Sequence, residues 1–330
     1  MANGNNTVGG LLAPIFYPSV SSVSKNRWSV IDHVELLVSV NHPQFLVSAL
    51  DIYKHQNSSE LISALSKAKE QSQIIIYDSG IYEVVWGRSK KWCRKRYVKT
   101  LKRNHFTHAF DYDIYCLNKS HDPCAFISKS ISSTKSQLSR DAISPIVHCN
   151  TISDYVETCV AVSKDLKPKL LAIPERELGR GTVEISKNIK TIRDALEQLD
   201  HYQPIHILGT GNPLSMMVYS FAGADSFDGL DWCQTVVDFD SATLHHPLHL
   251  DYYKHQSQYG SETDLSFLAR CYLHNLEFYE KWTDIIRDCK SGLDREKLLS
   301  RYFENKCLDE FLSIFNTKYT QVLTDEALAS

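Results

Sequence analysis

No run of 18 apolar residues occurs in the sequence, and the opening MANGNNTVGGLLAP has no basic segment followed by an apolar one. We therefore expect neither a membrane span nor a secretory leader, and no membrane partner. The nine cysteines are scattered and form no C-x-x-C pair, a usage typical of a reduced, cytoplasmic chain. The formal net charge of only −3 predicts no overall attraction for nucleic acid, so any such attraction must be local.

Also missing is a G-x-G-x-x-G segment after the first apolar run, so a dinucleotide-binding fold is not indicated. What recurs is a short apolar run that ends in polar residues, the pattern of buried parallel strands. These runs cover residues 34–40, 74–80, 108–113, 144–149, 170–175, 205–211 and 224–229. Helical periodicity lies between several of them, as in 58–71, 151–166 and 183–199, and this alternation predicts a parallel α/β architecture.

Polar residues stand one at the end of each of five predicted strands, namely Asp78, Asp111, His148, Glu175 and Asp228. Active sites of (β/α)8 barrels are assembled in this way at the C-terminal face. We therefore expect a single α/β domain over 1–330, with a (β/α)8 TIM barrel at about 13–280 and a helical C-terminal extension at about 281–330. The Ser-rich segment 128–141 predicts a mobile loop on the catalytic face.

Residues 223–238, GADSFDGLDWCQTVVD, interleave four carboxylates with large apolar side chains. A solvated loop would explain the acids but not their apolar company, so a functional site is the better interpretation. Within it we expect Trp232 to contact the substrate, and Asp225 and Asp231 to be structural.

Four strand ends resemble segments of the tRNA-guanine transglycosylase superfamily, whose members exchange guanine for a 7-deazaguanine. YDSG with Asp78 is similar to the family's D-S-G-G-F segment, whose aspartate acts near the leaving base. HAFDY with Asp111 is similar to M-A-F-D-E, whose aspartate reads the guanine edge. PIVHC places His148 where the family has a base-reading glutamine, and GADSFDG is similar to G-x-D-x-F-D-C, which makes Asp228 the candidate nucleophile.

The resemblance implies a reaction that uses two carboxylates. Asp228 would form a covalent glycosyl intermediate, while Asp78 would protonate the departing guanine and later deprotonate the incoming base. Asp111 would accept two hydrogen bonds from the donor edge of the base, with His148 and Glu175 as secondary members of that pocket.

Each of these residues also has a structural interpretation. Asp78 can cap a turn at Ser79 and Gly80, and Asp111 and Asp113 can form a solvated strand end. A single histidine such as His148 is more often a hydrogen-bonded core residue than a catalytic one.

The sequence departs from the family pattern at its zinc site. The C-x-C-x-x-C hairpin is absent between 239 and 270, although His274 stands at the place of the fourth ligand and Cys271 precedes it by three residues. A loop rich in histidine leaves a rebuilt site open, with His245, His246, His249 and His255. No cofactor is therefore assigned, and zinc at His274 and Cys271 is the one candidate.

Substrate recognition also differs. IPERELGR replaces the family's G-G-L-x-V-G-E loop, and GLDWCQTVVD replaces its P-T-R segment. Such divergence fits relatives that modify DNA in bacterial modification and antiviral defence systems, so DNA is favoured over tRNA by analogy.

Residues 86–104, WGRSKKWCRKRYVKTLKRN, contain nine basic residues and no acid. Cations interleaved with aromatic residues are typical of a surface that binds phosphates and stacks on bases, whereas a solvated helix face would normally mix both signs. The nucleic-acid-binding residues assigned here are Arg88, Lys90, Lys91, Arg94, Lys95 and Arg96.

The sequence thus predicts a pentosyltransferase that replaces guanine in a polynucleotide, DNA or tRNA, with a 7-deazaguanine. One alternative is a non-catalytic subunit that binds a nucleic acid or protein carrying the modified base, in a defence complex. Another is a nucleoside hydrolase that uses water as the acceptor. A homodimer is a further expectation from the resemblance alone.

Overall fold

A computed structural model of the chain describes residues 7–8, 11–24, 28–85, 91–113, 122–138 and 142–316. At its centre, eight parallel strands form one sheet in the order β7-β6-β5-β4-β3-β10-β9-β8. The strands are β3 (Ile15–Val20), β4 (Gln44–Ser48), β5 (Ile74–Asp78), β6 (His108–Phe110), β7 (Ile143–Ser144), β8 (Leu171–Pro174), β9 (Ile205–Leu208) and β10 (Ser226–Gly229). A parallel bridge between Ile146 and Ala172 joins the chain after β7 to β8, so the sheet closes on itself.

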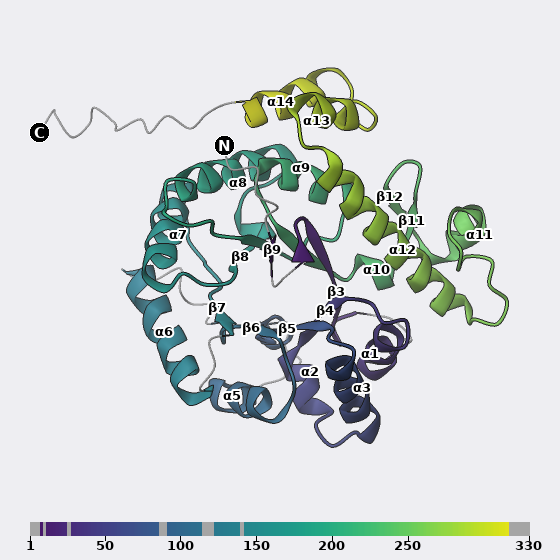
Figure 1. Ribbon diagram of the computed structural model, residues 1–330, viewed down its shortest axis with the longest axis horizontal. Coiled ribbons are helices and arrows are strands. Elements are labelled where there is room, and N and C mark those ends of the chain that lie inside the picture. The colour runs from purple at the N-terminus through teal and green to yellow at the C-terminus, as the bar shows by residue number, and fades with distance from the viewer. Residues whose placement is uncertain are drawn as a thin grey trace, which may run out of the picture.

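Helices follow the strands along the chain and surround the sheet, as Figure 1 shows. They are α1 (Val30–Ser39), α2 (Ala49–Lys54), α3 (Ser59–Glu70), α4 (Ile81–Val85), α5 (Arg94–Arg103), α6 (Pro123–Leu138), α7 (Ile152–Leu166), η2 (Glu175–Glu177), α8 (Thr182–Leu196) and α9 (Pro213–Ala222). This arrangement confirms the (β/α)8 TIM barrel expected from the sequence.

Further elements follow β10 and lie beside the barrel (Figure 1). They are α10 (Asp231–Gln234), β11 (Val236–Asp238), β12 (Thr243–His245), η3 (Pro247–His249), α11 (Leu250–Tyr253), η4 (Lys254–Gln256), α12 (Phe267–Asp288), α13 (Gly292–Leu299) and α14 (Asn305–Asn316). The C-terminal part is helical as predicted, but α12 begins within the segment assigned to the barrel. A short antiparallel pair, β1 (Thr7–Val8) and β2 (Leu11–Leu12), precedes the barrel.

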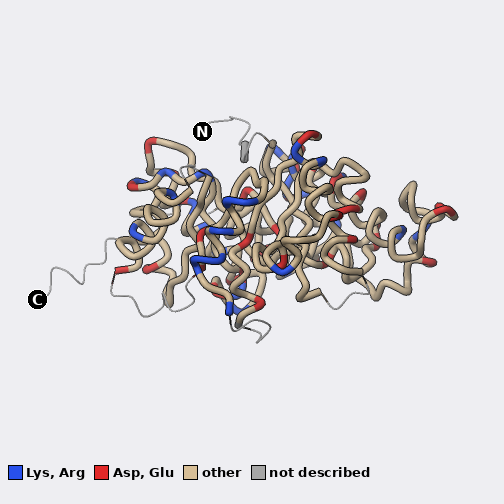
Figure 2. The backbone as a smooth tube through the Cα atoms, turned by 90° about the horizontal axis from the view of Figure 1, so that it is seen from below, with Lys and Arg blue, Asp and Glu red and all other residues tan. Residues whose placement is uncertain are grey.

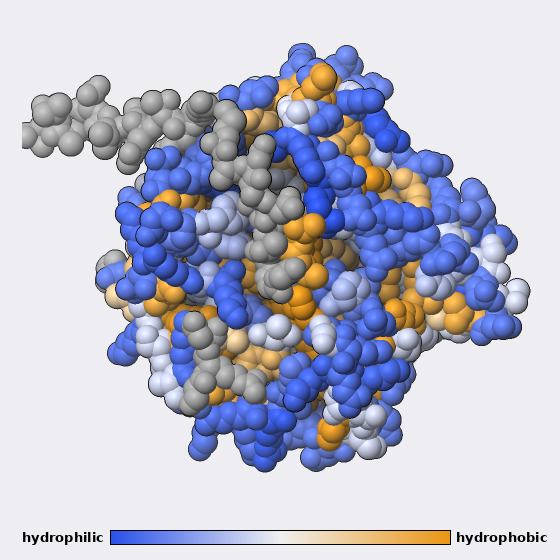
Figure 3. All heavy atoms as spheres, in the orientation of Figure 1, coloured by the Kyte–Doolittle hydropathy of each residue, from blue (hydrophilic) through white to orange (hydrophobic). Residues whose placement is uncertain are grey.

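Side chains inside the barrel form a separate apolar cluster, distinct from the larger core between strands and helices. Along each strand the side chains alternate between these two cores because of the pleat. The inner cluster contains Ile15, Tyr17, Leu46, Ile76, Phe110, Ile146, Leu170 and Ala172. On the face shown in Figure 3, hydrophilic residues dominate the outer rim, and hydrophobic residues gather mostly toward the middle. Among the described helices, none is long and apolar enough to cross a membrane.

Two predicted segments are wrong. Residues 34–40 lie in and just after α1 rather than in a strand, because Ser29 and Asp32 form a reciprocal capping box and the buried residues recur at helical spacing. The Ser-rich segment 128–141 is described to residue 138 and lies in α6 rather than in a loop, since Ile127, Ile131 and Thr134 bury one face of that helix. The first two barrel strands, β3 and β4, are absent from the predicted set of strands.

Candidate functional site

A cavity of about 360 Å³ opens at the C-terminal ends of the barrel strands. Its volume is within the range of small-molecule sites. Six carboxylates line it, from the ends of four strands (β5, β6, β8 and β10) or the segments that follow them: Asp78, Glu83, Asp113, Glu175, Asp228 and Asp231. The cations of its lining are Arg176 and, when protonated, His148. The cavity is therefore acidic and stands where barrel enzymes place their chemistry.

Asp228 lies at this cavity on β10 and is buried. Its Oδ2 accepts a hydrogen bond from the Ser19 hydroxyl at 2.7 Å, and its Oδ1 accepts one from the Gly209 backbone N–H at 2.9 Å. Gly209 has a positive φ of 81°, a conformation that favours glycine. These donors orient the carboxylate and stabilise its negative charge.

Asp78 lies at the same cavity, at the end of β5. Its Oδ2 accepts the Gly80 backbone N–H at 2.9 Å. Gly80 has a φ of 76°, and a Cβ there would come within 2.6 Å of the Leu50 Cβ, so the turn requires glycine. Burial raises the pKa of Asp78 to about 7, and the charges of Glu83, Asp228 and Asp113 add to this effect. Asp78 can therefore hold a proton near neutral pH.

The raised pKa of Asp78 predicts how the protein's stability depends on pH. The native state binds this proton more tightly than the unfolded chain does. The contribution of the protonated Asp78 to the free energy of unfolding is therefore complete below about pH 4 and is lost as the pH rises through about 7. Asp78→Asn is therefore expected to gain stability relative to the wild type between pH 4 and 8. Melting temperatures of both proteins across this range test the sign, and a difference that is constant with pH would contradict the assignment.

His148 connects the cavity to two carboxylates. Its Nε2 lies 2.9 Å from Asp113 Oδ1, and its Nδ1 lies 2.9 Å from Glu177 Oε1. Tyr155 donates a hydrogen bond to Glu177 Oε2 at 2.8 Å, which fixes the second carboxylate. Burial alone lowers the pKa of His148, but the hydrogen bonds and charges of Asp113 and Glu177 outweigh it and raise the pKa to about 9. The imidazolium thus holds Asp113 in place at the cavity.

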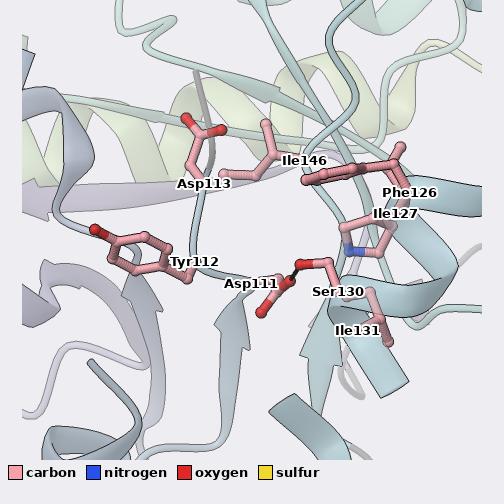
Figure 4. A pocket seen from close by; sticks show the side chains of 9 residues that line it. Asp111, Tyr112, Asp113, Phe126, Ile127, Ser130, Ile131 and Ile146 are labelled. Carbon is pink, nitrogen blue, oxygen red and sulfur yellow. Dashed lines mark hydrogen bonds between the residues drawn. The ribbon is translucent and has the colours of Figure 1, made fainter. Parts of the chain in front are cut away.

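Asp111 does not line this cavity, so the prediction that it reads the base edge disagrees with its placement. Because Phe110 points into the barrel, the next side chain points outward, toward the helices. There Asp111 pairs with the Arg94 guanidinium at 3.1 Å and accepts hydrogen bonds from Ser130 and, at 2.6 Å, Thr134. Figure 4 shows Asp111 hydrogen-bonded to Ser130, whereas the Asp113 side chain points away from that pair. Asp113 is thus the acid of this segment that lines the cavity.

The two other predicted substrate contacts have different outcomes. Glu175 lines the cavity at the start of η2, accepts a hydrogen bond from the Tyr219 hydroxyl at 2.9 Å, and has a pKa raised by burial. Trp232 does not reach the cavity, which contradicts its assignment to substrate binding. It is fully buried, packs against Tyr272, and donates its indole N–H to the Ser19 carbonyl at 2.8 Å. Its role is to hold β3 against the segment after β10.

The predicted basic residues divide into three groups. Arg88 and Lys90 lie outside the described residues. Arg94 points inward to Asp111, which contradicts its assignment to phosphate binding. Lys91 and Lys95 are exposed, and the half-buried Arg96 donates a hydrogen bond to the Lys91 carbonyl at 2.6 Å.

Helix α5 carries more exposed cations than the sequence assignment included. Lys99, Lys102 and Arg103 continue the exposed basic surface that begins at Lys91 and Lys95, and the first turn of α5 contains no acid. Figure 2, seen from the side on which α5 lies in Figure 1, shows Lys and Arg positions gathered near the middle of the molecule. We name these five residues the α5 basic face.

The residues do not fit a zinc ion at His274 and Cys271. His274 Nδ1 lies 2.7 Å from the Ser257 hydroxyl and its Nε2 lies 2.8 Å from the Val237 carbonyl, so both ring nitrogens have protein partners. The Cys271 thiol is buried and directed at the Pro247 carbonyl. Among described residues, no group of three or more His, Cys, Asp or Glu side chains could hold a metal ion. His274 instead ties α12 to β11.

The sequence did not predict a role for several residues at or next to the cavity. Ser19, Glu83 and Asp113 line the cavity without an assigned role, and Glu177, which contacts the cavity residue His148, was not assigned one either. Strand alternation could have found part of the set, because residues two positions beyond an inner residue share its direction. Ser19 follows Tyr17 in this way, just as the predicted residue Asp78 follows Ile76.

Scanning the chain against protein-family models gave no match, and a search of curated proteins found no similar sequence.

Proposed function

We propose that the chain is a base-exchange transglycosylase that replaces guanine in a polynucleotide with a 7-deazaguanine through a covalent bond to Asp228. The observation that carries the proposal is the pair of carboxylates at one cavity with different environments. Asp228 accepts hydrogen bonds that stabilise its charge, whereas burial and nearby charges favour a proton on Asp78. An ionised nucleophile and a protonated acid are what a two-step displacement at a sugar carbon requires.

In the first step Asp228 attacks the anomeric carbon, the bond to the guanine nitrogen breaks, and Asp78 transfers its proton to the departing base. In the second step the ionised Asp78 takes a proton from the 7-deazaguanine, whose nitrogen then attacks the same carbon and releases Asp228. No oxidant or further reactant is needed. Retention of configuration follows from the two successive displacements.

Recognition of the base is assigned to Asp113 and Glu175 in place of Asp111. Both line the cavity, and a carboxylate can accept two hydrogen bonds from the donor edge of a guanine. His148 holds Asp113 by its Nε2 at 2.9 Å, so that the acceptor oxygens are fixed before the base arrives. Because the cavity admits a base and not a duplex, the nucleotide would be flipped out of the helix.

We assign binding of the polynucleotide's phosphates to the α5 basic face, because the acidic cavity repels phosphate. We expect a Lys91→Gln, Lys95→Gln, Lys99→Gln variant to bind single-stranded or duplex DNA more weakly. Each lost phosphate contact lowers the slope of log affinity against log salt by about 0.9 for duplex DNA. Fluorescence anisotropy at several salt concentrations measures both quantities.

A matched control neutralises three exposed lysines of the C-terminal segment, Lys290, Lys297 and Lys306. It makes the same change in net charge at a different surface. If both variants lose binding equally, only the net charge matters, and the α5 basic face is not the binding surface.

The proposed function is tested by incubating the protein with guanine-containing DNA or tRNA and a labelled 7-deazaguanine. Incorporation with release of one guanine per label supports exchange. Release of guanine without incorporation selects the hydrolase. Binding of polynucleotide with neither reaction, and with no covalent adduct in denaturing electrophoresis, selects the non-catalytic subunit.

A further inference from the structure

A histidine inside the barrel contacts the proposed nucleophile. His206 is on β9, and its side chain is fully buried between the strands. Its Nε2 lies 3.2 Å from Asp228 Oδ1, and its Nδ1 lies 2.8 Å from the Ser226 hydroxyl oxygen. The rings of Phe110 and Tyr17 flank it, with centroids at 5.1 and 6.0 Å. This histidine has no part in the reaction steps given above.

The contacts determine which ring nitrogen carries hydrogen. Opposite an ionised Asp228, which can only accept, Nε2 must donate. The neutral ring then accepts at Nδ1, and the Ser226 hydroxyl, which can rotate, donates to it. In this arrangement each polar group in the chain Ser226, His206, Asp228 has a hydrogen-bond partner.

The two oxygens of Asp228 are consequently unequal. Oδ1 faces two donors, the Gly209 N–H at 2.9 Å and His206 Nε2 at 3.2 Å, whereas Oδ2 faces the Ser19 hydroxyl at 2.7 Å. The less occupied oxygen is the one available to form a bond to carbon. The other oxygen becomes the carbonyl of the ester and regains charge when the ester breaks.

We propose that His206 is a positioning residue for Asp228: it fixes the carboxylate with Oδ2 as the attacking oxygen and stabilises the charge that returns to Oδ1 when the glycosyl ester is released. This inference rests on the proposed function, because it assigns a role within that reaction. It does not depend on the identity of the polymer.

The chemical consequence is a shift in the balance between free carboxylate and ester. A hydrogen bond to a charged group favours the carboxylate over the uncharged ester, so its loss favours the ester. His206→Leu is expected to turn over about 10- to 100-fold more slowly and to accumulate more covalent adduct during turnover. His206→Gln keeps an N–H that can reach Asp228 and is expected to restore most of the rate. A loss of packing alone would not raise the adduct fraction.

A second measurement keeps the result interpretable without turnover. In protein labelled with ¹³C at the aspartate carboxyl carbon, the Asp228 signal, assigned by its absence in Asp228→Asn, is followed by NMR against pH. In His206→Leu this carboxyl is expected to take up its proton at higher pH than in the wild type, and His206→Gln is expected to reverse most of the change. If His206→Leu does not fold, Ser226→Ala removes the partner of Nδ1 and is expected to give a smaller shift in the same direction.

The outcomes separate the two proposals. A shifted titration together with increased adduct supports both. A shifted titration in a protein that forms no adduct even as wild type supports the contact but overturns the proposed function. An unchanged titration overturns the role of His206, whatever the activity.

Discussion

Asp228→Asn is expected to abolish base exchange and the covalent adduct while leaving the barrel folded. An amide is a very poor nucleophile toward the anomeric carbon, and removing a protease nucleophile lowers the rate by about 10⁶-fold. Incorporation of labelled 7-deazaguanine into DNA and tRNA measures exchange, and denaturing electrophoresis measures the adduct. The amide keeps the size of the side chain, so circular dichroism and the melting temperature should change little.

Asp238→Asn is the matched control for this experiment. Asp238 belongs to the same acid-rich segment but bonds to Ser241 and Gln256, away from the cavity. It should retain the wild-type rate. Exchange by Asp228→Asn at a rate near that of the control would remove Asp228 as the nucleophile.

Asp225→Ala is expected to have the largest effect on stability, about 3–5 kcal/mol. Asp225 is buried just before β10 and pairs with Arg193 Nη2 at 2.6 Å. It also accepts hydrogen bonds from Ile205 N–H, at 2.8 Å, and from Tyr202. Removing the acid leaves the Arg193 guanidinium buried without its counter-charge. Urea unfolding followed by circular dichroism measures the loss.

An exposed ion pair provides the comparison. Lys167 and Asp200 lie 3.1 Å apart with side chains 55% and 74% exposed, and such pairs contribute at most about 1 kcal/mol. Asp200→Ala should therefore change the free energy of unfolding much less than Asp225→Ala. Equal losses in the two variants would show that burial of the Asp225 pair has no special importance.

The barrel could be predicted from the sequence because short apolar runs and segments of helical periodicity alternate along the chain as its strands and helices do. Five of the eight barrel strands lie within predicted runs, and β7 overlaps a sixth run at Ser144. Among the predicted strands the exception is residues 34–40: β-branched residues favoured a strand, but the capping box at Ser29 and burial at helical spacing favoured α1. Local propensity was overruled by the cap and by packing.

The site was less predictable, because the direction of a side chain depends on where the regular strand ends, and the sequence gives only its position. Asp111 and Asp113 lie two residues apart just beyond the end of β6, where strand alternation no longer applies, and Asp111 contacts the helix layer whereas Asp113 lines the cavity. Arg94 illustrates the same limit, since a cation within a basic run is drawn inward by a single buried carboxylate. Charge runs indicate a surface only on average.

The closure of the barrel has a consequence for the shape of the cavity. β10 pairs with β3 over four residues and with β9 over two, whereas β7 meets β8 through the single bridge of Ile146 and Ala172. The strand that carries Asp228 is therefore paired with a neighbour on both sides. His148, in contrast, lies next to the place where the barrel closes through a single bridge. Under the proposed reaction, a stiff wall fixes the point of attack, and a more compliant wall adjusts to the base. Such a division would let one reaction centre accept 7-deazaguanines with substituents of different size.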